Sequence, residues 1–68
     1  MGSKQFKAGA IPVDSFGIRW CYGDTMEEAI RKISEKFGLP KNHYVYIKVR
    51  VPEGYYRAHK IIQLEKDF

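Results

Sequence analysis

The sequence predicts a small α+β fold in which two strands, one helix and two further strands follow one another along the chain. Three observations predict it: a helix with clear start and stop signals, a segment of strict period two after it, and turn residues that bound short apolar segments elsewhere. We expect a four-stranded, mostly antiparallel sheet, ββαββ in order, that packs one face on the single helix.

The size and composition of the chain limit what it can be. Its 68 residues have room for one domain, residues 1–68, of which residues 1–5 are expected to be flexible or left from cloning. Hydrophobic residues make up 44% of the chain and charged residues 29%, which is typical of a folded domain. No apolar run is long enough to cross a bilayer, so we expect a cytoplasmic protein with no membrane partner.

The helix is expected at residues 25–37. Thr25 can cap its first turn, and Glu28 three residues later completes a capping box. Gly38 suits a left-handed C-terminal cap, and Pro40 cannot continue a helix. The predicted core stripe is Met26, Ala29, Ile30, Ile33 and Phe37, and the predicted solvent side is Glu27, Arg31, Ser34 and Glu35.

Two strands are expected before the helix, at residues 6–13 and 18–22, around a turn at residues 14–17. Small residues and Pro12 weaken the first of them. In the second, we expect Trp20 to fill the thin core together with Ile18, which turns Cys21 to the outer side.

The third strand, residues 44–51, alternates with period two and is followed by a turn at residues 52–54 and a fourth strand at residues 55–64. Its valines and Ile47 form the buried side. The opposite side carries Tyr44, Tyr46, Lys48 and Arg50.

Two registers fit this hairpin. A four-residue loop pairs Val51 with Tyr56, adds Arg57 and His59 to the outer face, and turns Ala58, Ile62 and Leu64 inward. A bulged three-residue loop pairs Val51 with Tyr55 and adds Tyr56 and Lys60 instead.

One group of residues carries a family resemblance: Asp24, Thr25, Glu27, Lys32, Ile33, Lys36, Gly38 and Pro40. Over residues 17–47 the chain resembles ubiquitin from its first hairpin through its helix, which implies a β-grasp fold. The chain has space for one hairpin after Pro40 and lacks the terminal Gly-Gly, so no modifier role is expected. Residues 21–29 are also similar to the strand-to-helix junction of HicB-type antitoxins, a weaker resemblance.

Positive charge is concentrated in the second half of the chain. The net charge is +4, and residues 39–64 hold five of the cations against one carboxylate. Basic side chains among aromatic rings are typical of surfaces that bind single-stranded nucleic acid, and Tyr and Arg also dominate protein interfaces. The predicted binding residues are Tyr44, Tyr46, Lys48, Arg50, Arg57 and His59.

Catalysis has little support in the sequence. Cys21 is the only cysteine, and His43 and His59 are the only histidines, too few for a metal site within one chain. We therefore expect a binding module that is not an enzyme and needs no cofactor. Its partner is nucleic acid, single-stranded in preference, or alternatively a protein, as for an inhibitor or antitoxin-like subunit, and an exposed strand edge would also permit a dimer.

Overall fold

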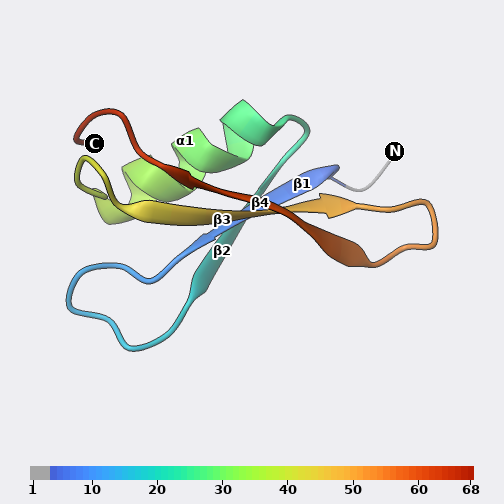
Figure 1. Cartoon of the computed structure of the whole chain (residues 1–68), viewed down its shortest axis with the longest axis horizontal. Helices are drawn as coiled ribbons and strands as arrows, with labels where there is room; N and C mark the ends of the chain where they lie inside the picture. Colours follow the sequence, from blue (N-terminus) through green and yellow to red (C-terminus); the bar gives the residue numbers. More distant parts are fainter. Residues whose placement is uncertain (1–3) are drawn as a thin grey trace.

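The computed structural model describes residues 4–68 and contains four strands and one helix in the order ββαββ (Figure 1). The elements are β1 (Phe6–Ala10), β2 (Arg19–Gly23), α1 (Met26–Phe37), β3 (Tyr44–Arg50) and β4 (Tyr56–Gln63). This confirms the predicted α+β fold. The expectation for residues 1–5 falls partly on residues 1–3, which lie outside the described part of the chain.

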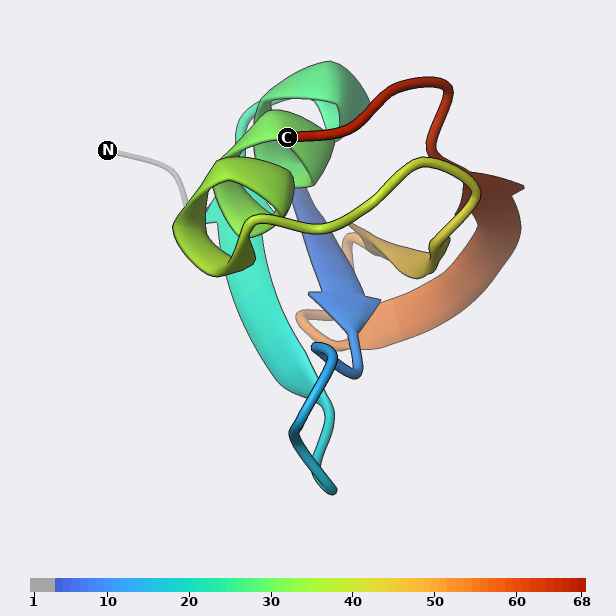
Figure 2. The same ribbon diagram turned by 90° about the vertical axis from the view of Figure 1, so that its left-hand side faces the viewer.

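The four strands form one sheet in the order β2-β1-β3-β4, and every neighbouring pair is antiparallel. Helix α1 packs against β1 and β2. Figure 2 shows the helix on one side of the sheet, and no element within residues 4–68 covers the other side. We call this uncovered side the open face.

The ends of α1 follow the predicted signals. Thr25 Oγ1 accepts a hydrogen bond of 3.1 Å from the Glu28 amide, as predicted for the cap. Glu28 Oε2 accepts one of 3.3 Å from the amide of Asp24, one residue before the amide of Thr25 that a capping box would use. A hydrogen bond from Lys32, helped by the Asp24 amide and the charges of Lys32 and Lys4, lowers the pKa of Glu28 despite partial desolvation. Gly38 ends the helix with φ 59°, the left-handed conformation that favours glycine.

The core lies between α1 and the sheet and extends beneath the C-terminal segment. Its fully or almost fully buried members are Ala8, Ala10, Ala29, Ile33, Leu39, Val45, Ile47 and Leu64. The two alanines of β1 leave room for the helix to lie close to the sheet. Ser34 was predicted on the solvent side, and this is wrong, because it is completely buried. Ser34 follows Ile33 in the sequence, and both side chains lie on the part of α1 that is covered by the rest of the molecule.

The predicted side assignment of β2 is wrong. Ala8 pairs with Cys21, and Gly9 pairs with Trp20. Because Ala8 is a core residue, Cys21 also faces the helix side and packs against the core, whereas Trp20 lies on the open face. Ile18, predicted to be buried with Trp20, is 41% exposed. The most hydrophobic residues of this strand were not its inward residues.

The first strand is shorter than predicted, ending at Ala10 rather than at Val13. Pro12 has no amide hydrogen to give to a neighbouring strand, and its carbonyl accepts a hydrogen bond of 3.1 Å from the Ser15 amide. A turn therefore begins where the strand was expected to continue. Asp14 within it has φ 70°.

The β3–β4 hairpin uses both of the predicted registers. From Tyr44 to Ile47 the pairing is that of the four-residue loop, with Tyr46 opposite Ile61. From Lys48 to Arg50 it is that of the three-residue loop, and the Val51 amide donates to the Tyr55 carbonyl at 2.9 Å. A bulge at His59 absorbs the extra residue between Ala58 and Lys60. The face on which a β4 side chain lies therefore follows one register before the bulge and the other register after it.

Within residues 4–68, no helix has the length and apolar character needed to cross a bilayer.

Candidate functional site

The strand pairings place the open-face side chains in rows that run across the sheet. One row contains Tyr22, Lys7, Lys48 and Ala58. The next row contains Trp20, Gly9, Tyr46 and Ile61. A row with two cations thus lies beside a row with two large aromatic rings, about 7 Å away along the strands.

Gly9 explains why Trp20 lies on this face. A Cβ atom at Gly9 would come within 2.5 Å of the indole ring of Trp20, so only glycine leaves space for the ring. The tryptophan thereby covers part of β1 that has no side chain of its own. The indole is half-buried and is positioned by the sheet itself, which gives the face a fixed aromatic surface.

Three rings surround the ammonium group of Lys7. Its Nζ lies 4.5 Å from the ring centre of Trp20, 4.8 Å from that of Tyr56 and 5.9 Å from that of Tyr22. We call these three rings the Lys7 cage. Tyr22 and Tyr56 also meet edge to face at 5.8 Å, and the Tyr56 hydroxyl donates to the Lys4 carbonyl at 2.8 Å. Cation–π attraction of this kind favours the charged form of a lysine.

Lys48 is the direct cross-strand neighbour of Lys7, and its Nζ lies 5.3 Å from the Trp20 ring centre. Partial burial lowers the pKa of Lys7, and the positive charge of Lys48 lowers it further. Two like charges directly opposite each other destabilise a sheet. Among residues 4–68, Lys4 forms ion pairs with Asp24 and Glu28, and Lys32 forms one with Glu28. None of these ion pairs involves Lys7 or Lys48.

None of the four strands contains an Asp or Glu residue. All eight lie in the helix, the loops or the C-terminal segment: Asp14, Asp24, Glu27, Glu28, Glu35, Glu53, Glu65 and Asp67. The strands hold six cations: Lys7, Arg19, Lys48, Arg50, Arg57 and Lys60. Three of them, Lys7, Lys48 and Arg50, lie on the open face, whereas Arg19, Arg57 and Lys60 pair with residues of the helix side. The open face thus holds cations among aromatic rings and no carboxylate of a strand.

Four of the six predicted binding residues lie on the open face: Tyr44, Tyr46, Lys48 and Arg50. The Arg50 guanidinium lies 5.8 Å from the Tyr56 ring centre, which connects it to the Lys7 cage. Tyr44 is 57% exposed and Tyr46 36% exposed, so both rings are open to a partner.

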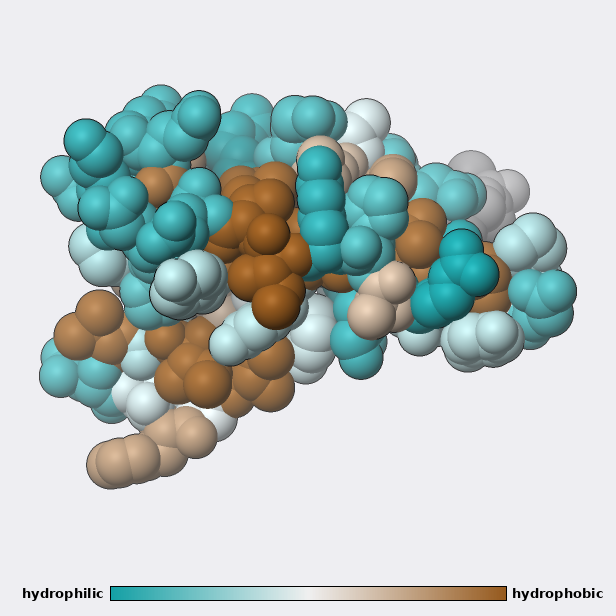
Figure 3. Space-filling model, in the orientation of Figure 1, coloured by the Kyte–Doolittle hydropathy of each residue, from teal (hydrophilic) through white to brown (hydrophobic). Residues whose placement is uncertain are grey.

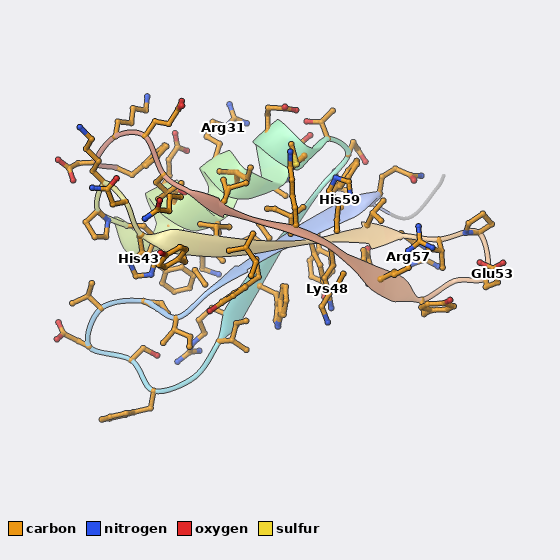
Figure 4. The ribbon with its side chains drawn as sticks, in the orientation of Figure 1. Arg31, His43, Lys48, Glu53, Arg57 and His59 are labelled. Carbon is orange, nitrogen blue, oxygen red and sulfur yellow. The ribbon has the colours of Figure 1, made fainter. Side chains whose placement is uncertain are left out.

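Arg57 and His59 do not join them, and their predicted placement is wrong. Arg57 pairs with Val49 in the three-residue-loop register, so its side chain points to the helix side of the sheet. The His59 ring contacts Phe6, which packs against the core, with 6.2 Å between ring centres. In Figure 4 both lie on the opposite side of the sheet from Lys48.

The sequence interpretation missed four residues that define the face: Lys7, Trp20, Tyr22 and Tyr56. A signal for Lys7 was present, because Phe6, Ala8 and Ala10 alternate with Lys7 and Gly9 at period two. Tyr56 was on the outer face in one of the two registers considered. The signal for Trp20 was Gly9 on the neighbouring strand, because a residue without a side chain leaves space for a large ring.

Groups that could support metal binding or thiol catalysis are dispersed. Within residues 4–68 no three His, Cys, Asp or Glu side chains gather as a metal site would require. Cys21 packs against the core, and the Nε2 atom of His43 is hydrogen-bonded at 2.9 Å to the Ile11 carbonyl oxygen. The exposed cations and rings of the open face can attract anions and stack against flat groups.

Comparisons with models of known protein families, with curated proteins and with solved structures gave no match. The resemblances to ubiquitin-like proteins and HicB-type antitoxins therefore stay predictions.

Proposed function

We propose that this protein is a small non-catalytic module that binds nucleic acid, single strands in preference, on its open face. The observation that carries the proposal is the pair Lys7 and Lys48, two ammonium groups on adjacent strands among aromatic rings with no carboxylate partner among the described residues. A phosphate placed between them would offset their mutual repulsion and favour the charged form of Lys7.

The rings favour nucleic acid over other polyanions. Bases stack on aromatic side chains with about 1–3 kcal/mol each, and Trp20, Tyr44 and Tyr46 supply such surfaces next to the cations. Arg50 extends the positive surface towards the hairpin loop. Cys21 has no second cysteine in the chain to pair with, which supports a reducing compartment such as the cytoplasm.

The test is the salt dependence of binding to a short labelled oligonucleotide, measured by fluorescence anisotropy between about 50 and 200 mM salt. The double variant Lys7→Met/Lys48→Met removes two phosphate contacts. We expect weaker binding and a log–log salt slope that is smaller by about 1.4, roughly 0.7 for each single-strand contact.

The matched control is Lys36→Met/Lys41→Met, which removes the same charge from the helix and the loop after it. General electrostatic attraction would weaken both double variants equally. If the open-face variant binds and responds to salt as the control does, or if no oligonucleotide binds the unaltered protein at low salt, the proposal is wrong.

A second candidate function is protein interaction, and a specific feature favours it. Hydrophobic side chains gather over the middle of β4 and again at the β1–β2 loop (Figure 3). The exposed members are Ile11, Val13, Phe16, Ile18 and Ile61, and Phe16 is fully exposed. Sedimentation of the protein alone tests for a dimer, and Phe16→Ser/Val13→Ser should abolish any self-association that uses this surface.

A further inference from the structure

A hollow of about 630 Å³ lies on the open face beside Trp20, within the range of small-ligand sites. Its open-face lining is Ile18, Trp20, Tyr46, Lys48, Ala58 and Ile61. The residues come from β2, β3 and β4 and from the segment just before β2, so the twisted sheet itself forms the hollow. Gly9 contributes to its shape, because the Trp20 ring occupies the space where a side chain would stand.

The chemistry of the hollow differs from that of the cation row next to it. Its lining is mostly apolar and aromatic, which suits a flat uncharged ring system. At one side Lys48 and Lys7 stand over the Trp20 ring, and no carboxylate lines the hollow. A ligand that fits both parts has a flat aromatic ring and, joined to it through a short linker, a negatively charged group.

We propose that this hollow receives one unstacked nucleobase of a single strand, while the phosphate beside that base lies on Lys48 and Lys7. The proposal rests on the proposed function and specifies its substrate. In a duplex both faces of each base are covered by its neighbours, so only a strand with an unpaired base can fill the hollow. The hollow would make the open face selective for single strands.

Three probes of equal length test this: an oligothymidine strand, an all-abasic strand with the same phosphates, and a duplex. Trp20 is the only tryptophan of the chain, so its emission reports directly on the hollow. We expect the oligothymidine strand to quench this emission. We also expect it to bind more tightly than the abasic strand by at least roughly 5- to 150-fold, the range for one stacked base, because further bases can stack on Tyr44 and Tyr46.

A filling variant separates the hollow from the cations. Ala58→Ile adds apolar volume at an exposed strand position without altering Lys7, Lys48 or Trp20. It should reduce the affinity for oligothymidine towards that of the abasic strand and leave abasic binding unchanged. Gln63→Ile is the matched control on the same strand, outside the hollow, and should change neither.

The outcomes distinguish this inference from the proposed function. If all three probes bind with equal affinity and leave Trp20 emission unchanged, the cations bind phosphate and the hollow holds no base. This result overturns the inference and the preference for single strands, and it leaves the binding of nucleic acid to the open face standing. If none of the probes binds at low salt, the proposed function fails with it.

Discussion

Gly9 and Gly23 lie on neighbouring strands and serve the two opposite sides of one sheet. Gly23 pairs with Phe6 and faces the helix, where an added Cβ atom would come within 2.6 Å of the Ala29 backbone nitrogen. Gly9 faces away from the helix, and there an added Cβ atom would meet the Trp20 ring. Gly23 leaves space for the backbone of α1, and Gly9 leaves space for the side chain of Trp20.

The difference shows how two kinds of packing coexist in a very thin domain. On the helix side, small residues bring α1 close enough to bury Ile33 and Ile47, which stabilises the fold. On the open face, the same lack of a side chain lets a large ring lie where a partner can reach it. Under the proposed function, stability and recognition would therefore depend on separate sides of β1 and β2.

The largest expected effect comes from Gly23→Ala. The new methyl group presses on the backbone of the first turn of α1, which cannot rotate away as a side chain can. We expect the free energy of unfolding to fall by about 1–3 kcal/mol, as for other overpacked sites. Urea denaturation measures it. Gly17→Ala is the control, because among the described residues no atom beyond its two chain neighbours lies within 4 Å of the added Cβ position. An equal loss there would contradict the assignment.

Gly9→Ala should affect binding more than stability. The methyl group displaces the Trp20 ring, which can swing into solvent, so the unfolding free energy should change by less than in Gly23→Ala. Loss of the stacking surface should weaken oligonucleotide binding by about 1–3 kcal/mol. Tryptophan emission and anisotropy titrations measure both effects. An emission spectrum identical to that of the unaltered protein would show that Trp20 does not rest on Gly9.

The smallest effect concerns the charge of Lys7. Lys48→Met removes the second cause of its lowered pKa but leaves burial, the larger cause. The pKa of Lys7 should therefore rise towards its ordinary value without reaching it. NMR titration of the Lys7 side-chain carbon next to the ammonium measures this, with Lys36→Met as the control. An unchanged pKa of Lys7 would show that the charge of Lys48 does not affect it.

The same shift has a consequence for stability. The pKa of Lys7 is lower in the folded chain than in the unfolded chain, so between these two values the unfolded chain binds more protons. Lys7 therefore makes the unfolding free energy rise as the pH increases through this interval. Lys48→Met should reduce that rise.

The helix could be predicted closely from the sequence because its signals are local. Thr25, Glu28 and Gly38 act on backbone groups a few residues away, and these interactions do not depend on the rest of the fold. The alternation of β3 was equally direct. The predicted buried side of β3 is confirmed at Val45 and Ile47, which are buried and alternate with the exposed Tyr44 and Tyr46.

The faces of β2 and β4 could not be predicted in the same way. Hydrophobicity favoured an inward Trp20, but the space beneath α1 suits the smaller Cys21, and the room for an indole was created by Gly9 on another strand. In β4 the pairing changes register at the bulge, so each of the two predicted registers holds for only part of the strand. Arg57 was misplaced for that reason, since its face follows from a shift that no local pattern encodes.

The bulge at His59 also bears on how this hairpin can vary among related sequences. Because two registers meet there, one residue lost from the β3–β4 loop can be matched by one residue gained beside the bulge. Such a change leaves the pairing of Tyr46 with Ile61 intact. In an alignment it would appear as two separate gaps, although the backbone path between them would hardly change. Sequences of unequal loop length can thus share the same hollow.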